Sequence, residues 1–399
     1  MKAGNIVPAG IVICLALAGT ALAQADFPAV KVAKEVGNSV VSIDIHSLAY
    51  TSVSAGGSAR TGSLATRRLT GFVYNKEGYI ITDSEGISEN AYIKVRLADN
   101  SELEADFIGK DDFYGIGVIK VDSPTPLTPV KMVKEFFSEV DNVYPYDRGD
   151  AVVAIGNSGG FGGTVTYGII SGVRVFRNRN RVLLPSMIQA DVVINSGNEG
   201  CPLFNDKGEM IGMHEHRGGG GSMQNTTFFQ PAGLVSRVAD DIIGDRLAGD
   251  DIEVWHPWLG IKTFAGTVSL LAGNLRSFSD DLKMFMDIPD QYWDVGIAVD
   301  TVYEESPARE YGLLSKDILM AVTILDKDEK EKRPYALLKD IQDLEIMVTT
   351  AAPGDIFVFQ VLRRHKIFDV EVVVGQHPGA FAYVSRFTGA DLQDSREFF

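Results

Sequence analysis

Short apolar segments separated by turn residues fill the first two thirds of the chain. Strands are expected in "GFVYNKEGYIITDSEGI" (71–87), "AYIKVRLADNSELEADFIGKD" (91–111) and "GIGVIKVD" (115–122), and again in "GDAVVAIGN", "TVTYGIISGVRVF" and "GEMIGMHEH". Glycine and asparagine stand at turns between these segments, and a helical stretch at 231–247 closes the series. Many short strands at such spacing predict a mostly β fold, either a barrel or a sandwich.

Two regions depart from this pattern. Residues 47–70 are rich in Ser, Thr, Gly and Ala, which predicts a flexible loop. Beyond a polar junction the pattern is mixed, with strands expected at 258–263, 296–302, 318–324, 356–363 and 366–374 and helical stretches at 280–286 and 335–349. This predicts a small α+β domain over 249–375, which is a usual domain size.

The N-terminal segment carries a basic residue, an apolar run and small residues before Ala23. It predicts a secretory signal peptide at 1–23, with a membrane anchor as the alternative. The predicted organisation is thus a signal peptide at 1–23, a barrel domain at 24–248, an α+β domain at 249–375 and a loosely structured tail at 376–399. We expect an exported protein with no stable membrane span after cleavage.

Charge and cysteine content restrict the partners and the chemistry. The chain has a formal net charge of −16, from 53 acidic and 37 basic side chains. Nucleic acid is not expected as a partner, because phosphate binding needs a basic surface. Signal cleavage removes Cys14 and leaves Cys201 as the single thiol, so no internal disulfide is expected.

Two longer segments point to a known family. "GDAVVAIGNSGGFGGTVTYGIISG" (149–172) and "IQADVVINSGNEGCPLFNDKGEMIGM" (188–213) resemble the second barrel and the nucleophile segment of HtrA/Deg proteins. "VAKEVGNSVVSI" and "GFVYNKEGYIIT" resemble the opening of these proteins and the segment that leads to their catalytic histidine. The resemblance covers roughly 27–375. It implies two six-stranded trypsin-like barrels followed by a PDZ domain.

The resemblance also identifies the positions of the catalytic triad, and all three differ here. Glu85 stands at the histidine position, Gly115 at the aspartate position and Glu199 at the serine position. Acyl transfer of this type needs a hydroxyl or thiol nucleophile, a base and a group that orients the base. A carboxylate beside the oxyanion loop, Gly197 and Asn198, opposes the charge that develops there. We therefore predict a catalytically inactive homologue that is not an enzyme and acts by binding proteins.

Other chemistry remains open at the same segment. Cys201 lies two residues beyond the serine position and is expected to be a small buried residue rather than a substitute nucleophile. Ser196 is expected to be a turn residue. Glu85 and Glu199 form an alternative carboxylate pair for acid–base work, so a hydrolase with residual or altered activity is the second hypothesis.

A third hypothesis is metal binding. His214 and His216 alternate along an expected strand and therefore share one face. A His-x-His pair on a strand is a workable set of metal ligands, with Glu85, Glu199 or Glu215 as oxygen donors. Two ligands without a placed third are a weak signal, so no cofactor is predicted and the two histidines stay candidates.

The second domain retains the residues expected of its family. The run Trp258–Leu259–Gly260–Ile261 resembles the loop with which bacterial PDZ domains hold a terminal carboxylate. The implied partners are C-terminal or extended peptides of exported proteins. The chain itself ends in Phe399, so its tail is a possible internal ligand or, alternatively, a disordered end. The family often forms trimers through the start of the barrel domain, here Phe27 and its neighbours.

Overall fold

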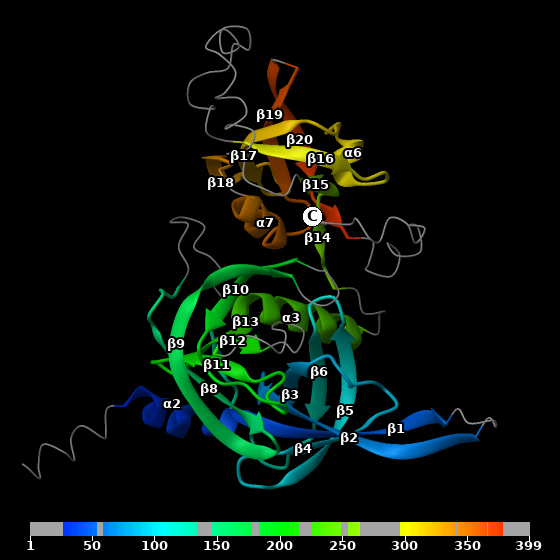
Figure 1. Ribbon diagram of the computed structural model, residues 1–399, viewed down its shortest axis with the longest axis vertical. Helices are drawn as coiled ribbons and strands as arrows, with labels where there is room; N and C mark the ends of the chain where they lie inside the picture. Colours follow the sequence, from blue (N-terminus) through cyan, green and yellow to red (C-terminus); the bar gives the residue numbers. More distant parts are fainter. Residues whose placement is uncertain are drawn as a thin grey trace, which may run out of the picture.

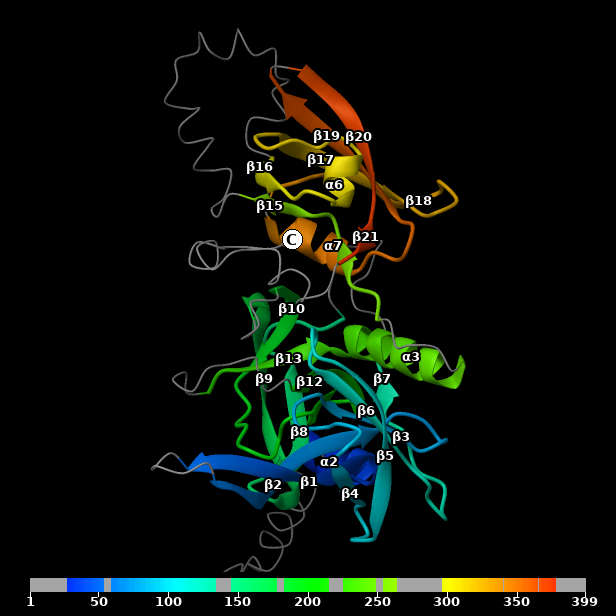
Figure 2. The same ribbon diagram turned by 90° about the vertical axis from the view of Figure 1, so that its right-hand side faces the viewer.

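The computed structural model describes residues 27–53, 59–133, 145–177, 183–214, 225–248, 254–263, 296–339, 341–364 and 366–377. The predicted signal peptide at 1–23 and most of the predicted tail, Phe399 included, lie outside these ranges. Figure 1 and Figure 2 show a barrel unit at one end of the long axis and a smaller C-terminal unit at the other. Among the described helices, none has the length and apolar character needed to cross a membrane.

The first barrel closes on itself in the strand order β1-β2-β3-β6-β5-β4. Its strands are β1 (Val40–Val53), β2 (Ala59–Val73), β3 (Tyr79–Asp83), β4 (Tyr92–Arg96), β5 (Glu102–Asp111) and β6 (Ile116–Val121). Alternate residues point inward, and Ile43, Leu69 and Ile80 are fully buried in its core. Strand β3 is buried along its whole length. Ile80 belongs to the core of the first barrel, and Tyr79 and Ile81 belong to a cluster that also contains residues of the second barrel.

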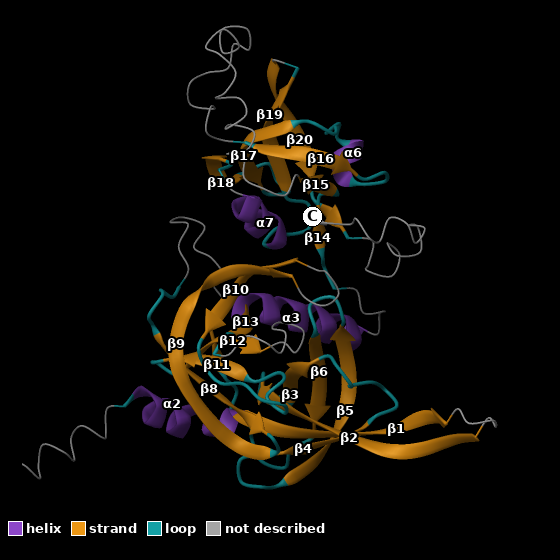
Figure 3. Ribbon diagram, viewed as in Figure 1, coloured by secondary structure: helices purple, strands orange, loops and turns teal. Residues whose placement is uncertain are grey.

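The second barrel has the order β11-β8-β9-β10-β13-β12 and closes through the pairing of β11 with β12. Its strands are β8 (Ala151–Ser158), β9 (Phe161–Arg177), β10 (Leu183–Ala190), β11 (Pro202–Asn205), β12 (Glu209–His214) and β13 (Thr227–Pro231), and the short β7 (Lys131–Met132) adds to β12. The mostly β double barrel confirms the fold predicted from the sequence (Figure 3).

Helices join the two barrels into one unit. Helix α2 (Pro28–Val36) runs into the short 3-10 helix η1 (Gly37–Ser39) before β1, and α3 (Ala232–Ala248) follows β13 directly. One hydrophobic cluster contains buried residues of both barrels and of both α-helices, among them Val32, Phe72, Phe204 and Val238. The barrels therefore share a core, which fixes the loops that meet between them.

The prediction of a flexible loop at 47–70 is wrong. Strands β1 and β2 continue through most of this stretch and pair in antiparallel register from Val40↔Phe72 to Val53↔Ala59. The resulting hairpin projects from the barrel unit (Figure 1). A projecting ribbon is held by backbone hydrogen bonds and needs no buried face, so its Ser- and Thr-rich sequence lacks the apolar alternation that marks a core strand.

The C-terminal unit is the expected mixture of strands and helices. Its sheet has the order β15-β16-β17-β19-β20, with β18 paired to β17 and a separate pair β14-β21. The elements are β14 (Pro257–Trp258), β15 (Ile261–Thr263), β16 (Ile297–Val302), α6 (Pro307–Glu310), β17 (Ile318–Leu325), β18 (Glu331–Leu337), α7 (Ile341–Thr349), β19 (Ile356–Arg363), β20 (Lys366–Val373) and β21 (Gly375–Gln376).

Two helix predictions in this unit need comment. The stretch 335–349 begins as strand β18, and only α7 is helical, because the charged segment before it folds back on β17 as a hairpin. The stretch 280–286 lies outside the described residues. The α7 helix packs its buried residues, Leu344, Met347 and Val348, into the core of the C-terminal unit.

Candidate functional site

The turn Gly197–Cys201 depends on two glycines. Gly197 has φ +96° and Gly200 has φ +83°, which is the left-handed region that side chains with a Cβ disfavour. A Cβ on Gly197 would lie 2.3 Å from the carbonyl oxygen of Asn157, and one on Gly200 would lie 2.4 Å from that of Thr70. The backbone of this turn is therefore locked against both barrels.

Thr70 of β2 is the residue that fixes the turn to the first barrel. Its N–H donates to the carbonyl of Glu199 at 2.9 Å, and its hydroxyl donates to the carbonyl of Gly197 at 2.7 Å. The same hydroxyl accepts from the N–H of Asn157 at 2.8 Å, and the Thr70 carbonyl accepts from the Thr82 hydroxyl at 2.7 Å. Sequence reasoning missed Thr70, because only the meeting of the barrels reveals its partners.

Glu199 folds its side chain back onto the turn that carries it. Its carboxylate oxygen Oε2 accepts a hydrogen bond from the N–H of Gly197 at 2.6 Å, and the residue is 8% exposed. In a trypsin-like site, backbone N–H groups of this turn stabilise the oxyanion of the reacting carbonyl. In this protein the N–H of Gly197, which the resemblance assigns to the oxyanion loop, is bound to a carboxylate of the same turn.

Glu85 lies just beyond β3, and Gly115 lies just before β6. The N–H of Glu85 donates to Asp83 Oδ1 at 2.8 Å, and its carboxylate pairs with Arg67 at 3.0 Å, with 44% of the side chain exposed. Gly115 has φ +78°, and its carbonyl accepts from the N–H of Ser84 at 3.0 Å. Gly115 brings no side chain that can orient a base.

The loop that carries Glu85 adjoins the turn that carries Glu199. A Cβ on Gly200 would lie 2.7 Å from the N–H nitrogen of Asp83 and 2.7 Å from the hydroxyl oxygen of Thr82. The structure therefore brings these two predicted positions to neighbouring segments, as the resemblance implied. Sequence reasoning did not find Arg67, the residue of β2 that forms the ion pair with Glu85.

The residues that flank Glu199 are buried. Asn198 is 3% exposed, and a Cβ on Gly156 would lie 2.4 Å from its side-chain oxygen Oδ1. Cys201 is 0% exposed and belongs to the core of the second barrel. Burial, with the Glu199 charge as a smaller cause, raises the pKa of the Cys201 thiol far above its usual range. The expectation that Cys201 is a buried core residue is confirmed.

His214 is also turned into the second barrel. It is 8% exposed, its Nδ1 lies 3.2 Å from the carbonyl oxygen of Phe228, and its ring lies 5.6 Å from the ring of Phe229. His216 and Glu215 lie outside the described residues. Within the described ranges, no three side chains of His, Cys, Asp or Glu gather as a metal site. Metal binding at these histidines stays an alternative hypothesis that the described residues do not test.

The backbone of the loop Trp258–Ile261 accepts hydrogen bonds from the segment that contains α6. The carbonyl of Leu259 accepts from the N–H of Ala308 at 2.9 Å, and that of Gly260 accepts from the N–H of Tyr303 at 3.0 Å. Gly260 has φ +77°, and Ile261 then opens β15, the outer strand of the described sheet. The three side chains of Trp258, Leu259 and Ile261 are buried.

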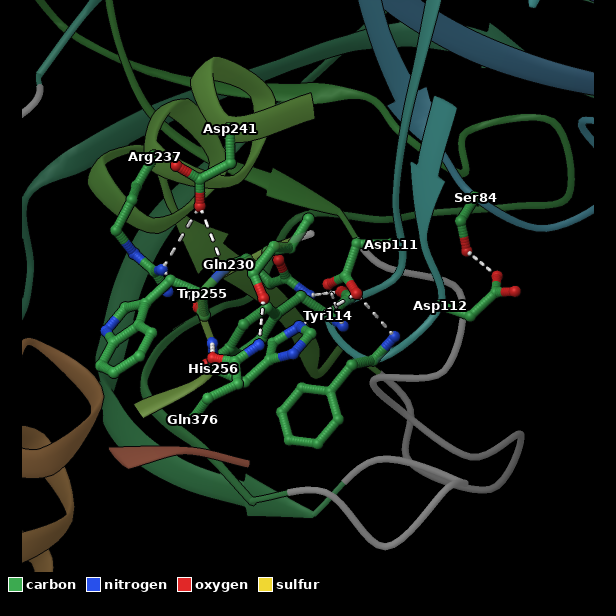
Figure 4. Close-up of polar contacts among 12 residues, drawn as sticks. Ser84, Asp111, Asp112, Tyr114, Gln230, Arg237, Asp241, Trp255, His256 and Gln376 are labelled. Carbon is green, nitrogen blue, oxygen red and sulfur yellow. Dashed lines mark hydrogen bonds and ion pairs between the residues drawn. The ribbon is translucent and has the colours of Figure 1, made fainter. Parts of the chain in front are cut away.

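A polar cluster joins the barrel unit to the segment before this loop (Figure 4). His256 Nε2 lies 3.0 Å from Asp111 Oδ1, and the Trp255 carbonyl accepts from Arg237 at 2.6 Å. Asp111 stands at the end of β5, four residues before Gly115. Sequence reasoning missed this cluster, because its members are far apart along the chain.

Comparisons with known proteins agree with this architecture. The trypsin-like peptidase domain family matches residues 69–213. The "Probable periplasmic serine endoprotease DegP-like" protein of Brucella suis biovar 1 (strain 1330) is 27% identical over 319 residues, which are 77% of this chain and 52% of that protein. The protein of the same name in Pseudomonas fulva (strain 12-X) is 30% identical over 313 residues, with 77% and 56% covered. The chain thus spans about half the length of the curated relatives it matches.

Solved structures give the same fold. The HtrA-type protease AlgW with a decapeptide superimposes with a TM-score of 0.60 at 23% identity, over 88% of this chain and 99% of that one. The serine endoprotease from Yersinia pestis superimposes with a TM-score of 0.54 at 21% identity, over 88% and 98% of the two chains. The relatives are named periplasmic proteins, which agrees with the expected export of this chain.

The prediction that the chain is not an enzyme is wrong by these findings, because the matched relatives are named serine endoproteases. The prediction excluded more than its physical basis allows. Losing a serine triad removes one route to acyl transfer, whereas carboxylates that activate water offer another route to hydrolysis. The family match, the relatives and the shared architecture together support an HtrA/Deg family protein, with similarity to the trypsin-like peptidase domain over residues 69–213.

Proposed function

We propose that this exported protein takes up C-terminal or extended segments of other exported polypeptides through a PDZ-like C-terminal unit and acts on them in a trypsin-like cleft with altered chemistry. The observation that carries the binding step is the loop Trp258–Ile261. Its carbonyl groups are fixed from behind by Ala308 and Tyr303, and it opens directly into the outer strand β15. Such a loop presents its amides to a terminal carboxylate, and such a strand pairs with an added peptide.

The comparisons support a peptide as the ligand. One solved relative with this fold, the HtrA-type protease AlgW, is described with a bound decapeptide. A free C-terminal carboxylate suits backbone amides at a glycine turn, and an apolar last side chain suits the buried surroundings of Leu259 and Ile261. The acidic chain, with its net charge of −16, also disfavours long-range attraction of acidic peptides.

The altered chemistry rests on Glu199. The sequence resemblance assigns Glu199 to the nucleophile position, and its carboxylate is held by the N–H of Gly197 at 2.6 Å. We propose that it acts on water rather than on the substrate. The water oxygen bonds to the peptide carbonyl carbon, its proton passes to the carboxylate of Glu199, and that proton reaches the leaving amine as the C–N bond breaks. The carboxylate must leave the Gly197 N–H before that donor can stabilise the oxyanion, so we expect slow hydrolysis.

Two measurements on the mature chain test the two steps separately. Binding is followed by fluorescence anisotropy with a labelled decapeptide that ends in Phe, as the free acid and as the amide. We expect the acid to bind at least about tenfold more tightly, since the amide loses the charge that the loop recognises. Equal affinity for the two peptides would contradict the binding step.

Hydrolysis is followed by mass spectrometry of an unfolded polypeptide incubated with the protein. Glu199→Gln should abolish cleavage, whereas the exposed Glu102→Gln in the first barrel should leave it unchanged. Cleavage should also resist reagents that modify catalytic serines, since no serine is required. Absence of cleavage by the wild-type chain, or unchanged cleavage in Glu199→Gln, would refute this step without touching the binding result.

We also propose that copies of the chain associate through an apolar face beside the N-terminal helix. Val165, Tyr167 and Ile169 alternate along β9 and are 40%, 42% and 41% exposed. Phe27 is 46% exposed, and its ring lies 4.8 Å from that of Tyr167. Aromatic and β-branched side chains gathered on one face are typical of an interface between subunits. The family resemblance suggests three copies.

Sedimentation equilibrium tests this assembly. Tyr167→Glu places a charge in the face and should convert the assembly to monomers. Tyr335→Glu is a matched control, because Tyr335 is 49% exposed on β18 of the C-terminal unit, away from this face. A monomeric wild-type protein, or an assembly that survives Tyr167→Glu, would show that this face is not the interface.

A further inference from the structure

The turn between β5 and β6 is joined to the segment that leads into the C-terminal unit. The Asp111 carboxylate, 6% exposed, lies 3.0 Å from Nε2 of His256, whose side chain is 12% exposed. Asp111 also accepts from the N–H groups of Phe113 at 3.3 Å and Tyr114 at 2.9 Å, and its carbonyl accepts from Gly115 at 2.9 Å. One carboxylate therefore orders this turn and holds the incoming segment (Figure 4).

The opposite end of the C-terminal unit returns to the same place. The N–H of His256 donates to the Gln376 side chain at 2.8 Å, and its carbonyl accepts from the N–H of His377 at 2.8 Å. The Phe113 ring lies 4.4 Å from the His256 ring and 5.3 Å from the His377 ring. Two imidazoles, one before β14 and one after β21, thus pack against one aromatic side chain of the barrel unit.

The imidazole of His377 also contacts the predicted peptide-binding loop. The ring of His377 lies 5.4 Å from the ring of Trp258 in an edge-on arrangement. A continuous set of contacts therefore runs from Trp258 through His377 and Phe113 to the turn that ends at Gly115. Contacts of this kind transmit a change only if they have two arrangements, which a titratable group can supply.

We propose that the contact among Asp111, Phe113, His256 and His377 is a proton-operated latch, which holds the C-terminal unit against the barrel unit near neutral pH and releases it when His377 gains a proton. Several described elements contribute charged or titratable groups here. Asp111 faces His256 from β5, and the buried Tyr114 ring lies 5.1 Å from the His256 ring. Arg237 and Asp241 of α3 lie 3.9 Å apart and both contact Trp255. Trp258 and Gln376, which also contact the two histidines, carry no charge.

The direction of the response follows from the surroundings of His377. Burial, and secondly the nearby His256, lower the pKa of His377 to about 4. In the released state its pKa returns to the ordinary value of about 6.5. The released state therefore binds the proton more readily, so docking is fully stable above about pH 6.5 and weakens as the pH falls from there toward 4.

The size of the response follows from the same two values. Each unit of pKa difference is worth tenfold in the docking equilibrium. The ratio of released to docked molecules should rise about tenfold between pH 7.5 and 5.5, and about 30-fold by pH 5.0. This response comes from one imidazole, so replacing that imidazole should remove it.

Energy transfer between two dyes on the mature chain measures the docking. Glu89→Cys in the barrel unit and Asp328→Cys in the C-terminal unit give exposed attachment sites, and Cys201 stays unlabelled because it is buried. In the labelled protein with His377 unchanged, we expect the efficiency of energy transfer to fall on acidification, following the calculated rise in the ratio of released to docked molecules. His377→Gln should flatten the change to less than about threefold, because glutamine does not titrate. His46→Gln, which alters a histidine of β1 outside the latch, should respond as the wild type does.

Two results would overturn the latch. One is constant transfer in the wild-type background from pH 7.5 to 5.0, and the other is equal acid release in His377→Gln. If His377→Gln fails to dock at any pH, proton NMR of the unmodified ring decides. A midpoint well below about 6.5 in the docked protein supports the latch, and a midpoint at that ordinary value contradicts it.

Discussion

The turn Gly197–Cys201 and the loop Trp258–Ile261 are built alike and differ in what they carry. Each uses a glycine of positive φ, Gly200 at +83° and Gly260 at +77°, that approaches a neighbouring segment too closely for any Cβ. Each is held by backbone hydrogen bonds from another segment, Thr70 in one case and Ala308 in the other. In the loop, the buried side chains suit the peptide binding that we propose. In the turn, Glu199 does not suit the acyl transfer that the resemblance to a trypsin-like nucleophile segment implies.

The comparison teaches that the backbone conformation of a loop and the chemistry of its side chains are specified by different residues. Close backbone approach demands glycine whatever the site does, so the turn keeps its shape with a carboxylate in place of a hydroxyl. The Glu199 carboxylate then accepts a hydrogen bond from the backbone N–H of Gly197 in the same turn. The fold is thus a poor guide to the mechanism, and the reaction must be inferred from the side chains at the site.

The largest expected effect is on the turn itself. Gly200→Ala should lower the free energy of unfolding of the barrel unit by at least about 3 kcal/mol, because positive φ and a clash with the Thr70 carbonyl act together. Gly149→Ala is the control, since Gly149 has φ +97° with nothing within 4 Å of its Cβ position. It should lose only about 1 kcal/mol. Urea unfolding followed by far-UV circular dichroism gives both values, and equal losses would show that close approach does not define the turn.

The second effect concerns Tyr114 of the barrel unit, whose ring lies 5.1 Å from the ring of His256 in the segment before the loop. Burial is the main cause that raises the pKa of Tyr114 to about 12. Its folded value exceeds the ordinary value of about 10, so the stability held by the buried phenol is complete below pH 10 and is lost between about 10 and 12. The loss should approach about 3 kcal/mol. Tyr114→Phe should remove that alkaline loss, as urea titrations at several pH values would reveal, and an unchanged pH dependence would contradict it.

The third effect tests the loop as a binding frame. A Cβ on Gly260 would lie 2.1 Å from Cβ of Ser306, so Gly260→Ala must displace the loop. We expect affinity for a peptide that ends in Phe to fall at least about tenfold, which is about 1.4 kcal/mol, with the barrels unaffected. Gly312→Ala, at φ +90° in open space, should bind the peptide as the wild type does. Isothermal calorimetry would distinguish the two variants, and full affinity in Gly260→Ala would refute a role for the loop.

The smallest effect is expected at Glu85. Its ion pair with Arg67 is partly exposed, with 44% and 32% of the two side chains accessible. Water screens such a pair, so Glu85→Gln should change the free energy of unfolding by less than about 1 kcal/mol, and less again at high salt. Thermal unfolding at two salt concentrations measures this. A larger loss would mean that Glu85 supports the site through contacts beyond this ion pair.

The sequence predicted the barrels well because their strands have buried faces. Short apolar runs between turn residues located β3 and β6, and the resemblance of the segment around Gly197 to a nucleophile segment located the turn. The sequence did not predict the outer part of the β1–β2 hairpin, where a stretch rich in Ser, Thr, Gly and Ala pairs as two strands without apolar alternation. It also failed for Thr70 and for the pair Asp111–His256. These contacts join residues far apart in the chain, and ordinary residue types at such positions carry no local signal.

The hydrogen bonds of Thr70 have a consequence for the dynamics of the barrel unit. Buried hydrogen bonds join Thr70 of β2 to Asn157 of β8 and to Glu199 of the turn Gly197–Cys201. Neither barrel can open at this place without breaking bonds that the other shares. We therefore expect the barrels to unfold as one cooperative unit, with the amide hydrogens of Thr70 and Asn157 among the slowest to exchange with solvent deuterium.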